Sequence, residues 1–172
     1  MNAPGILIGQ HRAIRDLFQE ITAEAIGHVR GRLASWLAEE IIAHMAGEEA
    51  FLYPAARRAL PGERSALEGA RDRDLALRLQ LRRFLGTSFD DPTFNTRLEI
   101  LREVFDEHVQ YEETELFPRL DTAMGTEALE SLGVQALASR PPIWIVTTEG
   151  QPLARPRDTG ARRVRVSLPS IR

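Results

Sequence analysis

An eleven-residue segment occurs twice in this chain and limits what the chain can fold into. Residues 44–54 read HMAGEEAFLYP, and residues 108–118 read HVQYEETELFP. In both copies a Glu follows a His by four residues, and a Leu, an aromatic residue and a Pro close the segment at matching offsets. Residues four apart share one face of an α-helix. Each copy therefore places an imidazole beside a carboxylate on one helix face.

Apolar residues at steps of three and four predict an amphipathic helix around each segment and one before each of them. We expect residues 1–9 to form a short leader and the first helix to begin near Gln10. Gly27 and Gly31 are expected to bracket the turn into the second helix. Pro54 is expected to end or kink that helix about a turn later.

The second half of the chain repeats this organisation. The third helix is predicted over residues 63–85, where apolar residues follow heptad steps. The fourth is expected to begin at Asp91-Pro92, because Asp can cap a helix and Pro suits its first position. Residues 126–138 can add a short trailing helix, whereas extended segments of the tail alternate with Gly and Pro.

Four amphipathic helices joined by short loops predict an all-α fold, an antiparallel up-down four-helix bundle. We assign the bundle to residues 1–125, a trailing helix to residues 126–139, and an Arg- and Pro-rich tail, extended or disordered, to residues 140–172. Hydrophobic residues make up 43% of the chain, which is enough for a sizeable core.

Composition excludes several classes of protein. Cysteine is absent, which rules out disulfides, zinc fingers, iron–sulfur clusters and thiol catalysis. The first 139 residues carry a net charge of −8, and the tail carries +5. No nucleic acid is therefore expected to bind the acidic bundle. A protein partner for the basic tail is possible. No apolar run approaches the roughly 20 residues of a membrane span. We expect a cytoplasmic protein with no membrane partner.

The predicted buried faces also carry polar residues that can bind a cation. His11 heads the apolar stripe of the first helix, 33 residues before His44. The same count back from His108 reaches position 75, and the nearest polar residue on the third helix's apolar seam is Asp74. The complete inward-facing set contains three imidazoles and three carboxylates: His11, His44, Glu48, Asp74, His108 and Glu112.

Such a set can hold two metal ions, with Glu48 and Glu112 as bridges. Buried charged groups are costly unless they are paired or bind a metal. Mixed nitrogen and oxygen ligands suit iron, manganese or zinc, and iron is the ion that carboxylate-rich pairs most often use for redox chemistry. We therefore predict two iron ions, with manganese or zinc as alternatives.

Several of these residues also have purely structural interpretations. One isolated His-x-x-x-Glu is usually a surface pair, but two copies with matching flanks favour a site. Asp74 can instead pair with a neighbouring Arg in the core. Glu113 is expected to face solvent beside the seam. Tyr111 either packs between helices or donates a hydrogen bond near the metals, and Tyr53 is expected to pack.

Other metal-dependent and catalytic motifs are missing. A ferritin-like site has Glu three residues before its His, and here Ile41 and Phe105 occupy those positions. No His-Glu-x-x-His motif of a metalloprotease and no glycine-rich phosphate loop occurs.

The order His, His-x-x-x-Glu, His-x-x-x-Glu resembles the hemerythrin-like, or HHE cation-binding, family over roughly residues 7–120. The resemblance implies a four-helix bundle with a metal site formed by His11, His44, Glu48, His108 and Glu112. Family members also carry a His on the third helix, which this chain lacks. Asp74, or alternatively Asp72, is expected to replace it.

The resemblance also implies a function. The oxygen carriers of the family use five His, and this chain has four His in all, so reversible oxygen transport is disfavoured. We expect a non-haem di-iron protein that binds, senses or reacts with oxygen, peroxide or nitric oxide. The alternative is a non-catalytic interaction or regulatory module whose metal is structural or an iron or redox sensor input. The sequence does not decide whether the protein is an enzyme.

Overall fold

The computed structural model describes residues 2–138, which are helical apart from short turns. The elements in chain order are α1 (Ala3–Ala23), α2 (Gly27–Gly47), η1 (Glu48–Leu52), α3 (Tyr53–Ala59), α4 (Arg64–Leu85), α5 (Phe94–Tyr111), η2 (Glu112–Leu116) and α6 (Phe117–Ala138). The two η segments are single stretches of π-helix. No helix among these residues is both long enough and apolar enough to cross a membrane.

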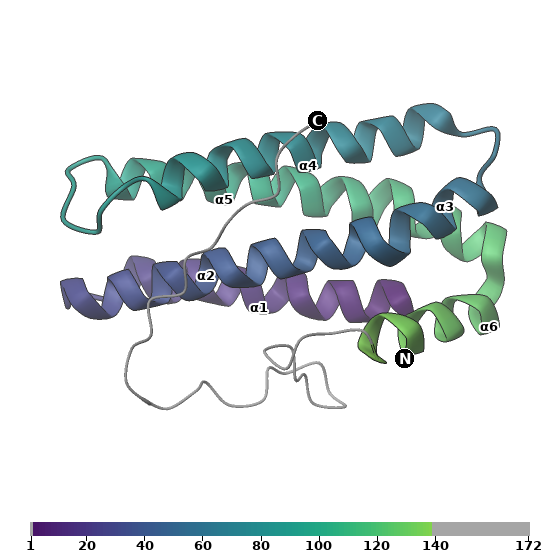
Figure 1. Ribbon diagram of the computed structural model, residues 1–172, viewed down its shortest axis with the longest axis horizontal. Helices are drawn as coiled ribbons and strands as arrows, with labels where there is room; N and C mark the ends of the chain where they lie inside the picture. Colours follow the sequence, from purple (N-terminus) through teal and green to yellow (C-terminus); the bar gives the residue numbers. More distant parts are fainter. Residues whose placement is uncertain (1, 139–172) are drawn as a thin grey trace.

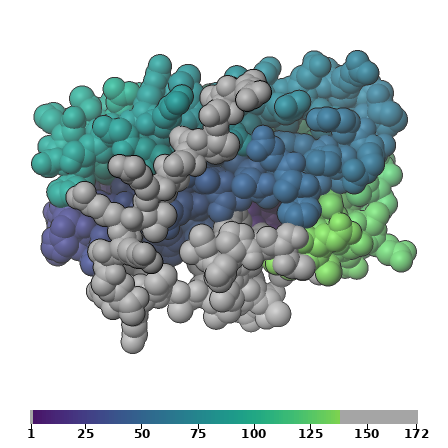
Figure 2. Space-filling model, viewed as in Figure 1, coloured from purple at the N-terminus to yellow at the C-terminus, as the bar shows by residue number. Residues whose placement is uncertain are grey.

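The long helices α1, α2, α4 and α5 run along the molecule as an antiparallel four-helix bundle, with α3 and α6 at one end (Figure 1). This confirms the predicted all-α bundle. Helices α2 and α4 contact each other, and both are seen on the face shown in the space-filling view (Figure 2). The predicted extended tail, residues 140–172, lies outside the described residues.

The apolar faces predicted from the sequence form the main core of the bundle. Its largest fully buried side chains include Phe18, Leu37, Leu81, Leu101 and Phe105, which come from all four long helices. The heptad pattern of α4 is reproduced, because Leu77, Leu81 and Phe84 all face inward.

Leu81→Ala should destabilise the protein by about 2–5 kcal/mol, because it removes a fully buried side chain and leaves a cavity. The matched control is Leu79→Ala on the same helix, where the leucine is 45% exposed and the expected change is within about 0.5 kcal/mol. Chemical denaturation of both variants measures the difference. Equal effects would mean that α4 does not bury the predicted face.

The predicted leader is wrong, because α1 already begins at Ala3. The side-chain oxygen of Asn2 accepts a hydrogen bond from the backbone N–H of Gly5 at 2.9 Å, and Pro4 lies in the first turn. Asn before a helix and Pro in its first turn are ordinary start signals. The added turns bury Ile6 and Leu7, so the first residues belong to the core.

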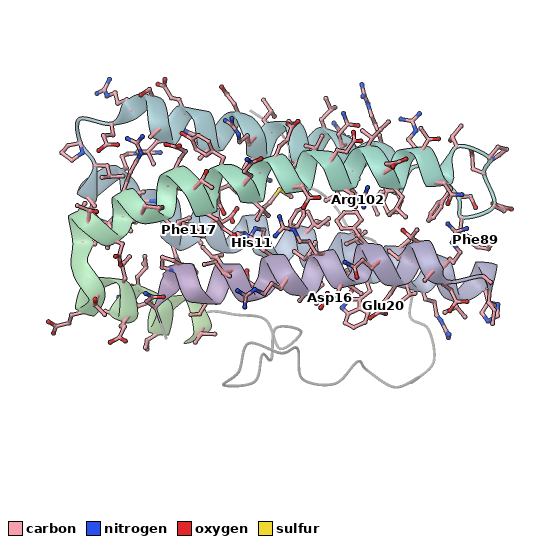
Figure 3. The ribbon with its side chains drawn as sticks, turned by 180° about the vertical axis from the view of Figure 1, so that it is seen from behind. His11, Asp16, Glu20, Phe89, Arg102 and Phe117 are labelled. Carbon is pink, nitrogen blue, oxygen red and sulfur yellow. The ribbon has the colours of Figure 1, made fainter. Side chains whose placement is uncertain are left out.

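The expected turn at Gly27 and Gly31 also differs from the structure. The turn occupies residues 24–26, so Gly27 is the first residue of α2 and Gly31 lies inside that helix. The ring of Phe89, from the α4–α5 loop, passes so close that a Cβ on Gly31 would lie 2.8 Å from it. These glycines therefore allow a close approach between segments at the bundle end opposite α6, where Phe89 is labelled in Figure 3.

Helix α5 begins at Phe94, two residues after Pro92, the expected first helical position. The carboxylate of Asp91 accepts hydrogen bonds from the backbone N–H and the hydroxyl of Thr93, both at 2.7 Å. Asp91 therefore stabilises a turn just before the helix instead of capping the helix itself.

Pro54 interrupts the second helix but does not end it. In both repeats the π-helical segment ends two residues before the proline, and an α-helix resumes with Pro54 or Pro118 in its first turn. Proline has no N–H and its ring clashes with the carbonyl four residues earlier. The wider π-helical turn is therefore found where the regular α-helical hydrogen bonding is interrupted.

The predicted trailing helix is the second part of α6. Gly125, with φ of 73°, forms the kink that separates it from the first part. Such a φ is easily adopted only by glycine. After the kink, Leu129 and Leu132 are buried in clusters that include Leu7 and Ala3 of α1. The last helix therefore packs against the start of the first.

Candidate metal centre

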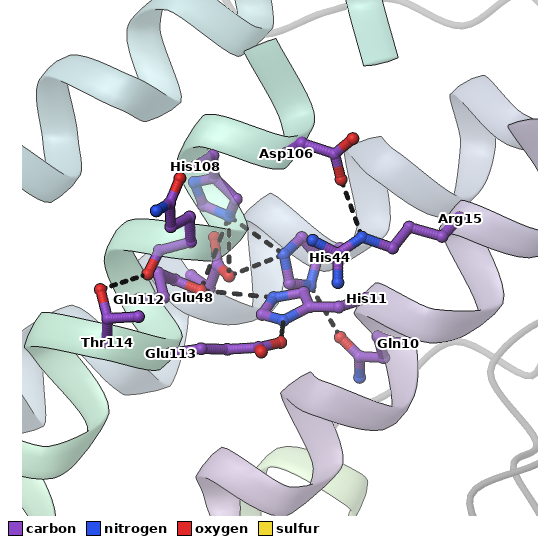
Figure 4. A network of polar contacts seen from close by, with 11 residues as sticks. Gln10, His11, Arg15, His44, Glu48, Asp106, His108, Glu112, Glu113 and Thr114 are labelled. Carbon is purple, nitrogen blue, oxygen red and sulfur yellow. Dashed lines mark hydrogen bonds and ion pairs between the residues drawn. The ribbon is translucent and has the colours of Figure 1, made fainter. Parts of the chain in front are cut away.

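Five of the six predicted ligands converge in the bundle interior: His11, His44, Glu48, His108 and Glu112. One nitrogen or oxygen atom from each lies within 4.8 Å of all the others, and all five residues have no solvent exposure. Figure 4 shows the imidazoles and carboxylates facing one another across the space between the helices. The group lies nearer the end that α6 covers, where Figure 3 places His11 beside Phe117.

The spacing within the group suits ligands of a shared ion. The Nε2 atom of His44 lies 2.8 Å from Oε1 of Glu48 and 3.3 Å from Nε2 of His108, and the latter nitrogen lies 3.5 Å from the same Glu48 oxygen. Oε2 of Glu112 lies 3.4 Å from Nε2 of His11 and 3.6 Å from Nε2 of His108. Metal bonds of about 2.1 Å place neighbouring ligand atoms roughly 3 Å apart.

The repeated segment explains how the helices position these groups. His44 lies in the last turn of α2 and Glu48 opens η1, while His108 and Glu112 take the same positions in α5 and η2. The four-residue spacing keeps each pair on one face before the helix widens. His11 comes from α1, and Phe117 stacks parallel to its ring with the centroids 6.1 Å apart.

Each imidazole is held from its outer side by a side-chain oxygen. Nδ1 of His11 lies 2.8 Å from Oε1 of Glu113, and Nδ1 of His44 lies 2.9 Å from Oε1 of Gln10. Nδ1 of His108 lies 3.1 Å from Oδ1 of Asp74, which is an ion-pair distance, although neither atom completes a hydrogen bond among the described residues. These contacts direct all three Nε2 atoms toward the centre, the arrangement in which outer partners orient metal-binding histidines.

Several polar atoms at the centre lack hydrogen bonds from the described residues. They are both carboxylate oxygens of Glu48 and of Glu112, and Nε2 of His11. Buried polar groups without partners cost about 1–3 kcal/mol each, and more when they are charged. A metal ion supplies the missing partner for every one of these atoms, so the donor set fits a bound cation.

The pKa values in the metal-free site show the same need for positive charge. Burial lowers the pKa of His11 to about 4. Burial also favours the neutral form of His108, but Glu48 and Glu112 outweigh it and raise its pKa well above the usual value. Burial and the adjacent Glu48 raise the pKa of Glu112 well above its ordinary value. The charge of Glu48 therefore opposes the ionisation of Glu112, whereas His44 and His108 outweigh burial and hold the pKa of Glu48 well below its ordinary value. A bound cation would favour the ionised form of Glu112.

Asp74 lies outside the group of five, on the far side of His108. The copies of the repeat are offset by 64 residues, so the counterpart of His11 is Leu75 and the counterpart of Asp74 is Gln10. Successive helix residues point about 100° apart, and α4 turns Asp74 inward while Leu75 is 50% exposed. Asp74 therefore does not occupy the position expected of the missing third-helix His, and the alternative, Asp72, is exposed.

Asp74→Ala should weaken metal binding by about 10–100-fold without lowering the number of ions bound, because it removes an outer partner of His108. Asp72→Ala, two residues earlier on the same helix, should bind metal like the unaltered chain. Titration with metal, followed by elemental analysis at saturation, separates affinity from stoichiometry. Loss of one ion in Asp74→Ala would instead identify Asp74 as a direct ligand.

Sequence reasoning missed two outer partners and left the tyrosines unsettled. Gln10 was expected only to begin a helix, and Glu113 to face solvent, although its side chain is 32% exposed and contacts His11. Tyr111 packs between helices, donating a hydrogen bond to the carbonyl of Ala66 at 2.8 Å. Tyr53 is buried as predicted, but its hydroxyl has no partner among the described residues. The 64-residue offset applied to Asp74 would have pointed to Gln10.

The fold and the buried cluster define a four-helix bundle of metal-binding type. The sequence matches the model of the Hemerythrin HHE cation binding domain over residues 3–120. The chain belongs to this family.

A solved structure supports the same fold. The chain is similar to a Hemerythrin HHE cation binding domain-containing protein from Mycobacterium kansasii, with 24% sequence identity and a TM-score of 0.71. The match covers 80% of this chain and 84% of that one. No curated protein matches the sequence.

Proposed function

We propose that this protein carries a non-haem di-iron centre that binds, senses or reacts with oxygen, peroxide or nitric oxide. One observation carries the proposal: three imidazole nitrogens and two carboxylates lie within 4.8 Å of one another, entirely away from solvent. His11, His44 and His108 would hold the ions from their Nε2 atoms, and Glu48 and Glu112 would bridge them. Bound iron would supply the electrons for reaction with such small molecules.

Burial of the ligands supports a small reactant. All five ligating side chains have no solvent exposure, and apolar residues such as Phe105 and Phe117 surround them. A diatomic molecule or a peroxide fits such a setting better than a bulky organic substrate does. The outer partners of the three histidines hold the imidazoles in place, with their Nε2 atoms directed toward the metal centre.

Elemental analysis and an optical spectrum of the freshly purified full chain test the proposal. We expect two iron ions per chain and an absorption spectrum that changes when peroxide or nitric oxide is added. Glu107→Gln, on an exposed face of α5, provides a control that should behave identically. A chain purified with no bound metal, and unable to take up iron anaerobically, would refute the proposal.

The same burial also favours a second candidate, in which the metal is structural or the input of a sensor. In a buried site, a small oxidant can change the oxidation state of the metal once, without repeated turnover of a substrate. Stoichiometric additions of peroxide distinguish the two. An enzyme consumes many equivalents per chain. A sensor consumes about one peroxide for every two ferrous ions it holds, because peroxide accepts two electrons, and a structural site consumes none.

A further inference from the structure

The outer partners of the two repeated histidines differ in charge. Gln10 and Asp74 are counterparts under the 64-residue repeat, and each contacts the Nδ1 atom of the histidine in its own half, at 2.9 and 3.1 Å. The partner of His44 is a neutral amide, whereas the partner of His108 is a carboxylate. The two halves of the site therefore differ at this pair of positions, in addition to the difference at His11, whose counterpart is Leu75.

The Gln10 contact determines which nitrogen of His44 is free to bind a metal. The amide oxygen can only accept a hydrogen bond, so Nδ1 of His44 must carry the hydrogen and Nε2 must carry the lone pair. That lone pair points toward Glu48 and His108. Gln10 is only 5% exposed, so water does not readily replace it.

The strength of an outer hydrogen bond changes the imidazole that donates it. A carboxylate accepts a stronger hydrogen bond than a neutral amide does, and a stronger outer acceptor makes a metal-bound imidazole a better electron donor. His11 has the carboxylate of Glu113 as its hydrogen-bond partner, and His108 has the carboxylate of Asp74 as an ion-pair partner at 3.1 Å. His44 is the exception among the three histidines of the cluster.

We propose that Gln10 is a positioning residue that makes the two halves of the metal centre electronically unequal, with His44 as the weakest imidazole donor. The inference rests on the proposed metal centre. The half formed by His44 and Glu48 then favours the lower oxidation state of a bound iron, relative to the half that His11 and Glu112 complete. The four residues His44, Glu48, His108 and Glu112 match between the repeats, so the difference between these two His–Glu pairs lies in the outer contact; His11, which has no counterpart in the second repeat, is a separate difference.

Exchanging the outer partners tests this directly. Gln10→Glu gives both halves a carboxylate, Asp74→Asn gives both an amide, and the double variant reverses the natural arrangement. Gln10→Met keeps the side-chain size but removes the acceptor. The control is Gln19→Glu, which adds the same charge on an exposed position of α1. Metal-free circular dichroism of each full-length variant verifies folding.

Two measurements are made on each variant. The first is affinity for Co²⁺ alone, followed by its visible spectrum, which does not depend on iron reactivity. Gln10→Met should bind Co²⁺ about 10–100-fold more weakly, and Gln10→Glu should bind at least as tightly as the unaltered chain. The second is the midpoint potential of the iron-loaded protein. Gln10→Glu should lower it, Asp74→Asn should raise it, the double variant should largely cancel both shifts, and Gln19→Glu should leave it unchanged.

The outcomes separate this inference from the proposed function. If the unaltered chain binds neither Co²⁺ nor iron, both fail. If it binds both, but Gln10→Met has unaltered Co²⁺ affinity or Gln10→Glu and Asp74→Asn shift the potential in the same direction, only the role of Gln10 is refuted. A purely structural role for Gln10 predicts lower stability in the variants but no opposite shifts in potential.

Discussion

Removing the metal should lower the melting temperature of this protein by about 10–20 °C. A ligand present at 1,000 times its dissociation constant stabilises the folded state by about 4 kcal/mol, and in a domain of this size each kcal/mol moves the melting temperature by roughly 3–5 °C. The physical reason is the cluster itself. Without a cation, both carboxylates of Glu48 and Glu112 remain buried without hydrogen-bond donors from the described residues.

Differential scanning calorimetry before and after chelation, and after reloading with iron, measures this effect. Reloading should restore the original melting temperature, which separates metal loss from damage by the chelator. A protein that melts at the same temperature in all three states would show that no cation is needed to stabilise the buried ligands.

Glu112→Gln should nearly abolish metal binding while leaving the metal-free protein as stable as before, or more so. The substitution removes an anionic ligand that contacts both His11 and His108, so affinity should fall by more than about 100-fold, beyond the loss typical of outer partners. In the metal-free protein, burial and Glu48 raise the pKa of Glu112. Glutamine closely resembles the protonated acid, which is the form that the metal-free fold favours.

The sign of the pH dependence follows from the direction of this pKa shift. A carboxyl group whose pKa is raised by folding binds its proton more tightly in the folded state, so it costs stability once pH rises above the ordinary value. Glutamine has no such cost. The stability advantage of metal-free Glu112→Gln should therefore grow as pH rises from about 4 toward 8.

Metal titration and thermal melting at several pH values test both parts of this prediction. Glu107→Gln on the exposed side of α5 provides the matched control, and it should retain metal binding and the usual chelator response. If metal-free Glu112→Gln melts well below the unaltered metal-free chain, the carboxylate of Glu112 does not destabilise the metal-free fold and the prediction is wrong.

Much of the helical organisation follows from local sequence patterns. The heptad spacing of Leu77, Leu81 and Phe84 predicts a helix and identifies its buried face. A helix places these apolar side chains on one side, and packing that side against the core removes them from water. Helix boundaries were less accurate. The first helix starts at the signal formed by Asn2 and Pro4 instead of near Gln10, and Gly31 lies inside a helix, where Phe89 from a distant loop packs against it.

The chain itself determined the four-residue His-to-Glu spacings, their duplication, and hence a centre made of imidazoles and carboxylates. Only the tertiary structure decided which side chains converge on the metal centre and which ones contact the outer nitrogens of its histidines. The rotation of α4 turns Asp74 rather than Leu75 inward, and the packing of α1 against α2 brings Gln10 to the outer nitrogen of His44. The physical reason is that periodicity assigns a residue to a helix face, whereas ligation depends on differences of about an ångström that are set by how the faces of separate helices fit together.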